Sequence, residues 1–150
     1  MPYAVTIEAR YPRDADTVFA EALQFSELAE AMRGLAAYDG LPEGEAYEGQ
    51  TCTVDVTLFG VFRNPGHMMH VERLDRAARV LQSREHNPSV RRWDHTLSVQ
   101  PEGDGCLWTD RILVDAARAA WATAHFARFV YARRHRHRAA QSIAKSLRRV

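Results

Sequence analysis

The chain has 150 residues, of which 26% are charged and 46% belong to the broad hydrophobic set, and its formal net charge is +1. This length suits one globular domain over residues 1–150, and this composition excludes a disordered chain. No stretch approaches the roughly 20 apolar residues of a membrane span, and the first residues lack the pattern of a secretion signal. We therefore expect a cytoplasmic protein without a transmembrane segment.

The first part of the sequence predicts a strand followed by two short helices. Residues 3–11 alternate between two sets of side chains, as a half-buried strand does. Pro12 ends this strand, and Asp14 or Asp16 is expected to cap the first helix. Ser26 is expected to cap the second. The turn-forming residues of 38–44 then predict a connection that contains a short strand.

The middle of the sequence predicts an antiparallel sheet, because alternating segments are separated by turn-forming residues. The expected strands are 51–59, 67–74, 78–86, 91–100 and 106–115, with turns at 64–66, 75–76, 87–89 and 101–105. The last turn, rich in glycine, indicates a hairpin. After Asp115 the period changes from two to 3.6, which predicts one long helix over 117–147.

One stripe of this helix is expected to face the sheet. It consists of Ala122, Phe126, Phe129, Val130, Arg133, Ala140, Ile143, Ala144 and Leu147. Such a stripe is ordinary core, unless the sheet curves enough to leave a pocket beneath the helix.

Charge is unevenly distributed along the chain. Residues 1–60 contain 3 Arg and 11 acidic residues, whereas residues 117–150 contain 9 basic residues and no acidic one. Either the basic helix pairs with acids of the first part, such as Glu43, Glu45 or Glu48, or it binds an external anionic partner or membrane. The amphipathic pattern favours internal pairing. Because no nucleic-acid motif accompanies the basic segment 133–138, we expect no nucleic-acid partner.

The hairpin over 91–115 has one register that places apolar residues on one face of the two strands and polar residues on the other. It is self-consistent if Trp93, His95, Leu97 and Val99 lie opposite Ile112, Asp110, Trp108 and Cys106. One face is then apolar apart from His95 and Asp110, and the other carries polar and charged pairs. One of Arg84 and Glu85 must also point to the inner face.

His95 and Asp110 are the candidate catalytic residues. An aspartate can orient an imidazole and hold its pKa near working pH, which suits acid–base chemistry. The alternative is a buried polar pair that stabilises the fold.

Metal and redox sites are not expected. His67 and His70 should face opposite sides of a strand, and His135 and His137 are far apart around a helix. Cys52 and Cys106 form no CxxC pair and are expected as thiols. We expect neither a metal nor a cofactor.

Several segments together resemble the START and polyketide cyclase/dehydrase superfamily (SRPBCC), in an uncharacterised bacterial branch. They are Val5-Thr6-Ile7-Glu8 with Asp16-Thr17-Val18-Phe19, the hairpin segments 92–97 and 105–112, and 129–135 of the long helix. The resemblance implies the α+β helix-grip fold, in which a curved antiparallel sheet wraps around a C-terminal helix. It also implies that the hollow between them holds a lipid, polyketide or other hydrophobic ligand.

We therefore expect a monomer or homodimer that binds a hydrophobic or amphipathic small molecule between sheet and helix. The expected ligand-binding residues are Phe25, Met32, Phe59, Trp93, Leu97, Trp108, Ile112, Phe126, Phe129 and Val130. The first alternative is a cyclase- or dehydratase-like enzyme that uses His95 and Asp110. The second is an interaction module whose hollow is filled by its own side chains.

Overall fold

The computed structural model describes residues 2–116 and 119–147, the last eight of these through their helical backbone alone. The strands are β1 (Tyr3–Tyr11), β2 (Ala36–Asp39), β3 (Thr51–Leu58), β4 (Phe62–Asp75), β5 (Val80–His86), β6 (Arg92–Glu102) and β7 (Gly105–Asp115). The helices are α1 (Ala15–Ala22), α2 (Phe25–Ala31) and α3 (Ala120–Leu147).

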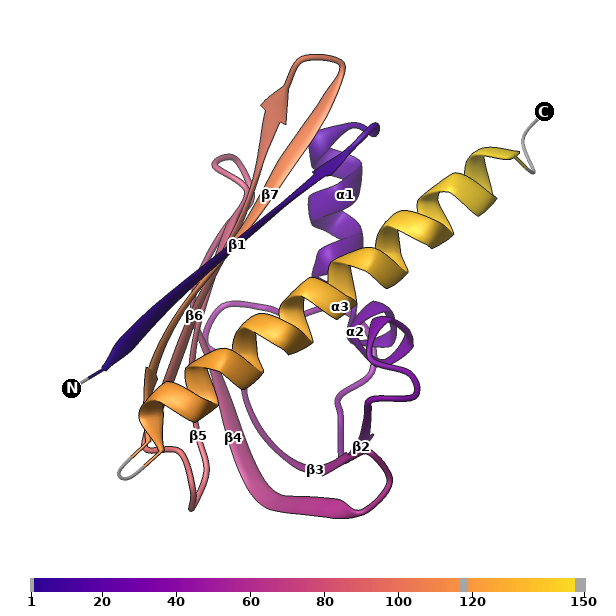
Figure 1. Cartoon of the computed structure of the whole chain (residues 1–150). Coiled ribbons are helices and arrows are strands. Elements are labelled where there is room, and N and C mark those ends of the chain that lie inside the picture. Colours follow the sequence, from indigo (N-terminus) through magenta and orange to yellow (C-terminus); the bar gives the residue numbers. More distant parts are fainter. Residues whose placement is uncertain (1, 117–118, 148–150) are drawn as a thin grey trace.

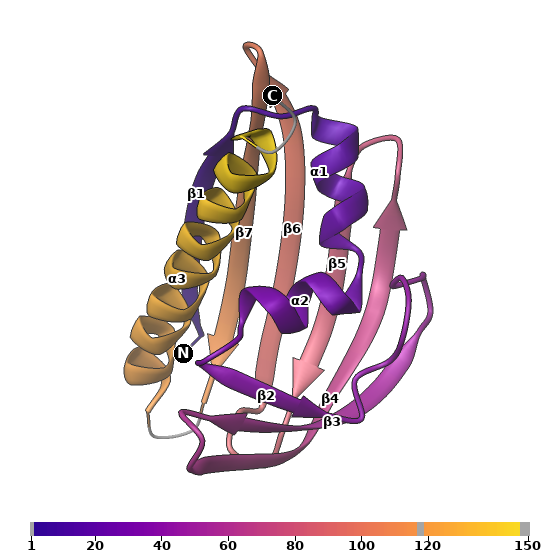
Figure 2. The same cartoon turned by 90° about the vertical axis from the view of Figure 1, so that its right-hand side faces the viewer.

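The strands form one antiparallel sheet in the order β1-β7-β6-β5-β4-β3-β2. The sheet curls, and all three helices lie on its concave side (Figure 1). Turned by 90°, the same arrangement shows α3 running along β1 and β7, with α1 and α2 in front of the middle strands (Figure 2). The chain thus has the expected α+β helix-grip fold. Among the described residues, no helix combines the length and apolar character needed to cross a membrane.

The N-terminal elements follow the predicted pattern except at one helix cap. In β1 the side chains of Val5 and Tyr11 are buried, while the alternate ones are exposed. Asp14 caps α1, because its carboxylate accepts a hydrogen bond from the backbone N–H of Thr17 at 2.9 Å. The expected cap at Ser26 is wrong: Ser26 lies inside α2, which begins after Gln24 without a side-chain cap.

The turn between β3 and β4 lies earlier than expected. Phe59 and Gly60 adopt positive φ angles of 53° and 72° and reverse the chain there. The predicted turn residues 64–66 instead belong to β4, at a bulge where three steps of β4 oppose two of β3. Gly66 has a φ of 67°, and its N–H donates to Asp55 Oδ1 at 2.8 Å. A bulge accommodates proline and glycine inside a strand, which explains the misplaced turn.

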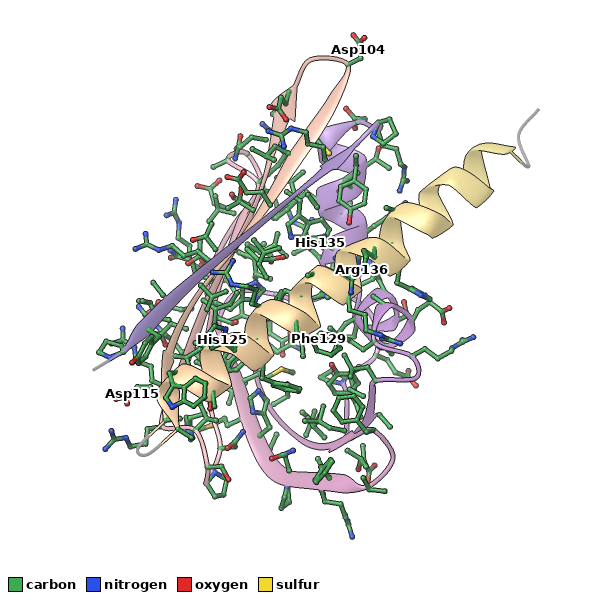
Figure 3. All side chains as sticks on the ribbon, viewed as in Figure 1. Asp104, Asp115, His125, Phe129, His135 and Arg136 are labelled. Carbon is green, nitrogen blue, oxygen red and sulfur yellow. The ribbon has the colours of Figure 1, made fainter. Side chains whose placement is uncertain are left out.

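The β6–β7 hairpin keeps its predicted faces but has a different register. Glu102 pairs with Gly105, so the turn has two residues, and Asp104 lies at its tip while Asp115 lies at the far end beside the start of α3 (Figure 3). The partner of His95 is therefore Ile112 and not Asp110. The shift is two residues, and side chains repeat every two residues along a strand, so each still points to its expected side.

The buried face of α3 is rotated from the predicted stripe. Its buried side chains are Ala124, Ala127, Val130, Tyr131, Arg134, His135 and Arg138. Phe129, expected on this face, is 46% exposed. Ala124 and Ala127 are small enough to let the helix pack closely on the sheet. Further along the helix, the buried His135 forms hydrogen bonds with Tyr11 and Asp110. The expected positions Ala140, Ile143, Ala144 and Leu147 lie outside the side chains that the structure describes.

Candidate ligand-binding site

A cavity of about 830 Å³ lies between the concave face of the sheet, α2 and the N-terminal half of α3. Its walls are mainly apolar. Six of the ten expected ligand-binding residues line it: Phe25, Met32, Trp93, Leu97, Phe126 and Val130. The sheet therefore stands away from the helix here, and its own side chains leave the space open.

The other four expected residues lie outside the cavity. Trp108 and Ile112 are almost completely buried in the core, because α3 and α1 pack directly over β7. Phe59 is 50% exposed, because the left-handed backbone of the β3–β4 turn directs it outward. Its ring meets that of Phe126 edge-on, with centroids 6.5 Å apart. With Phe129 exposed as well, the expected lining role of these four is not what the structure shows.

His95 and Asp110 are hydrogen-bonded in the interior, although they are not directly opposite each other. His95 Nε2 lies 2.7 Å from Asp110 Oδ1, and Asp110 is fully buried. Leu97 is the direct partner of Asp110, so His95 reaches it diagonally on the same face. Diagonal neighbours remain within reach of long side chains. His95 also lines the cavity.

A second histidine, which the sequence analysis set aside, completes this cluster. His135 of α3 points toward the strands (Figure 3), and its Nε2 lies 2.6 Å from Asp110 Oδ2. The carboxylate thus accepts one hydrogen bond from each imidazole. The hydroxyl of Tyr11 donates to His135 Nδ1 at 2.8 Å, which is consistent with a neutral imidazole protonated at Nε2. A hydrogen-bonded chain therefore runs from β1 through α3 and β7 to β6.

Burial and hydrogen bonding determine the charge states of the hydrogen-bonded side chains in this cluster. Burial alone would raise the pKa of Asp110, but the hydrogen bonds from His135 and His95 outweigh it and hold this pKa well below its ordinary value. Burial lowers the pKa of His135 despite the neighbouring carboxylate. Burial also raises the pKa of Tyr11 to about 12. Near neutral pH the cluster therefore contains an ionised Asp110, a neutral His135 and a neutral Tyr11.

The structure also settles which residue of β5 points inward. Glu85 lines the cavity, whereas Arg84 lies on the outer face with Glu72 and Asp94. Glu85 accepts hydrogen bonds from His67 Nε2 at 2.9 Å and from the Ser83 hydroxyl at 2.6 Å. Burial opposes ionisation, yet these hydrogen bonds and the electrostatic interactions with His67 and His95 keep the pKa of Glu85 below its ordinary value.

The basic segment of α3 pairs with other acids than those expected. Arg138 Nε lies 3.7 Å from Glu27 Oε1, and His137 Nε2 lies 4.0 Å from Glu30 Oε1, both on α2. Internal pairing with the first sixty residues is present, but among the described side chains of α3 none pairs with Glu43, Glu45 or Glu48. Arg138 is also buried above the Trp108 ring, with its guanidinium carbon 4.3 Å from the ring centroid. Burial lowers its pKa to about 9.

Arg134 is the one permanently charged cation among the described cavity-lining residues. It comes from the same turn of α3 as Tyr131, and its guanidinium lies 5.7 Å from that ring. Arg134 is 7% exposed, and its Nε has no hydrogen-bond partner. The sequence predicted only that the basic segment 133–138 pairs with acids or an anionic partner, and it did not place Arg134 at a cavity.

The described residues contain no group of three His, Cys, Asp or Glu side chains arranged to hold a metal ion. Cys52 is half-buried and Cys106 is buried, both as free thiols. Burial raises the pKa of each thiol, which makes it a poor nucleophile. The chemistry of the cavity therefore rests on His95, Glu85, Arg134 and their partners.

One sequence signal could have revealed the true inner face of α3. Ala124, Ala127, Tyr131 and Arg138 recur at helical spacing, and Arg134 and His135 lie beside them. Small residues at such positions indicate a helix that packs closely. A face centred on alanines would have placed His135 next to the hairpin.

No protein-family profile matches the sequence, and no curated protein matches it significantly. Solved structures do match the fold. Protein CV1439 from Chromobacterium violaceum superposes with a TM-score of 0.74 at 11% identity, over 93% of this chain and 96% of that one. TTHA0849 from Thermus thermophilus superposes with a TM-score of 0.71 at 12% identity, over 96% of this chain and 99% of that one. Ara h 8.0201 superposes with a TM-score of 0.67 at 9% identity, again over 96% of this chain and 99% of that one. At these identities the likeness establishes a shared helix-grip fold.

Proposed function

We propose that the protein binds a hydrophobic or amphipathic small molecule in the cavity between the sheet and α3. The observation that carries this proposal is the cavity itself. Its volume of about 830 Å³ falls within the range of roughly 300–1,000 Å³ typical of small-molecule sites. Mainly apolar walls with a few convergent polar groups are also typical of such sites.

The arrangement of the walls further supports this proposal. Trp93 and Leu97 come from the sheet, Met32 follows α2, and Phe126 and Val130 belong to α3. An interaction module with a filled hollow would have no such space. Membership of the START and polyketide cyclase superfamily, which the sequence resembles, is part of the same proposal, and the shared fold supports it.

Binding is tested first with N-phenyl-1-naphthylamine, an uncharged dye that fluoresces in apolar surroundings. We expect saturable binding with one dye per protein. The variant Ala36→Trp should weaken binding by about tenfold or more, because Ala36 lines the cavity and the indole would occupy ligand space. Ala37→Trp is the matched control, because Ala37 is the next residue of β2 and is exposed. Equal binding by both variants would contradict the proposal.

Native mass spectrometry of the freshly purified protein gives an independent test. A co-purified molecule of a few hundred daltons should appear with the wild type and be reduced in Ala36→Trp. Its mass and fragmentation would identify the ligand class directly.

The geometry of His95 favours a second candidate function, proton transfer to or from the bound molecule. Its Nε2 is held by Asp110, while its Nδ1 has no hydrogen-bond partner among the described residues. In the tautomer with the proton on Nε2, Nδ1 is a base at the cavity wall, and Asp110 would stabilise the imidazolium formed when it takes a proton. A cyclase- or dehydratase-like enzyme needs such a group.

His95→Gln tests this function, because the glutamine amide can still donate to Asp110 but cannot accept a proton. If the protein is an enzyme, the wild type should convert the co-purified molecule, and His95→Gln should bind it without converting it. Unchanged turnover in His95→Gln would exclude this role for His95.

A further inference from the structure

The ionisable groups that line the cavity differ in whether the protein already satisfies them. Glu85 is bound by His67 and Ser83, and His67 Nδ1 accepts from the amide of Asn87 at 3.2 Å. His95 is held by Asp110. Arg134 is the exception: its guanidinium forms no hydrogen bond or ion pair with another described residue.

Among the described residues no carboxylate forms an ion pair with Arg134; Glu85 lines the same cavity but accepts from His67 and Ser83. The sequence has no Asp or Glu after Asp115, so residues 117–118 and 140–150 contribute no carboxylate side chain. Asp110 is occupied by two imidazoles, and Glu27 lies next to Arg138. The Nε of Arg134 is buried without a hydrogen-bond partner, which is costly for a charged group. The cost is recovered if a ligand supplies the anion.

We infer that the natural ligand is an amphipathic carboxylic acid whose carboxylate binds Arg134 and whose apolar body lies along Met32, Phe126 and Val130. This inference rests on the proposed binding function and specifies its ligand class. The guanidinium presents two parallel N–H donors, which match the two oxygens of a carboxylate. Arg134 is the one permanent cation among the described lining residues, so the cavity offers one cationic group to pair with one anionic headgroup.

The test compares ligands that differ only in their headgroup. Dodecanoic acid, dodecan-1-ol and dodecyl phosphate each compete with N-phenyl-1-naphthylamine for the wild-type protein. We expect dodecanoate to bind about 10- to 100-fold more tightly than the alcohol, as charge-assisted hydrogen bonds predict. The preference should persist at about pH 8.5, where an ordinary histidine is neutral and an ordinary arginine is charged.

Arg134→Gln should remove the preference for the acid, so the measured quantity is the ratio of the acid and alcohol affinities within each variant. Arg136→Gln is the matched control, since Arg136 is an exposed residue of the same helix and its loss removes the same charge. Arg134→Lys should keep part of the preference, because it retains the charge but not the two-pronged geometry.

The outcomes separate this inference from the binding function. Absence of dye binding would overturn both. Dye binding with equal affinity for acid and alcohol would overturn the carboxylate assignment and leave the binding function standing. Tighter binding of dodecyl phosphate than of dodecanoate would also overturn that assignment. The wild-type comparison needs no variant, so a poorly folded Arg134→Gln would not prevent a decision.

Discussion

The Nε2 atom of His135 lies 2.6 Å from Oδ2 of Asp110, which joins α3 to the middle of β7 inside the protein. The carboxylate is ionised there and the imidazole is neutral. Any condition that favours protonation of either group must therefore act against folding.

We predict that the protein loses stability as the pH falls below about 6.5. Burial lowers the pKa of His135 from its ordinary value of 6.5, so the unfolded chain takes up this proton at a higher pH than the folded protein. The free energy of unfolding should thus decrease as pH falls from the unfolded pKa toward the folded one. Asp110, whose pKa is also lowered, should add to this loss below about pH 4.

Urea unfolding at about pH 7 and pH 5 measures this effect of His135. The decrease between the two should be smaller in His135→Gln than in the wild type. His125→Gln, at an exposed position of the same helix, should keep the wild-type decrease. An identical decrease in all three proteins would show that His135 is not the group responsible.

The hydrogen bond between His95 and Asp110 predicts different results for two substitutions of the histidine. His95→Leu removes one of the two imidazole donors to a fully buried carboxylate and should cost about 1–3 kcal/mol. His95→Gln keeps an N–H donor and should cost clearly less. Chemical denaturation measures both, and equal costs would mean that packing and not hydrogen bonding accounts for the loss.

The β6–β7 hairpin shows how far sequence patterns determine this fold. Alternation correctly assigned each side chain to a face, because that assignment depends only on parity along the strand. The register depends on which of Gly103 and Gly105 forms the turn, and both suit a turn by composition. The structure places a positive φ of 55° at Gly103 and makes Gly105 the first residue of β7.

The site was harder to predict because its polar members come from distant elements. His95 and Asp110 share a hairpin, so their proximity follows from local pairing. His135 lies in the interior because Tyr11 of β1 and Asp110 of β7 bind its imidazole, and Arg134 does so because it lines the cavity. The hydropathy of α3 alone favours a face that is rotated from the buried one and shares Val130 with it.

Gly105 offers a sharp test of the hairpin geometry. A Cβ at this position would overlap the backbone carbonyl oxygen of Tyr11 on β1. Gly105→Ala should therefore separate β1 from β7 locally and destabilise the protein by about 2–3 kcal/mol. Gly103→Ala has open space around its Cβ and should cost only about 1 kcal/mol, through its positive φ. Thermal unfolding of the two variants provides the comparison.

The ring of Phe59 lies beside that of Phe126, which lines the cavity, so the β3–β4 turn lies at the edge of the cavity. We predict that Phe59→Ala increases both the association and the dissociation rate of N-phenyl-1-naphthylamine several-fold, with little change in affinity. Stopped-flow fluorescence measures both rates. Val61→Ala is the control, because Val61 lies in the same turn and is 70% exposed. Equal rates in the two variants would mean that ligand enters elsewhere.

The hydrogen-bonded chain of Tyr11, His135, Asp110 and His95 also determines where the molecule can open. It joins the middle of α3 to three strands, whereas Ala122, Thr123 and Phe126 of the first turns border the cavity. Local opening begins where few buried contacts must break. Amide hydrogen exchange should therefore be faster around Thr123 than around Tyr131, with the N-terminal half of α3 swinging as a flap about a fixed centre.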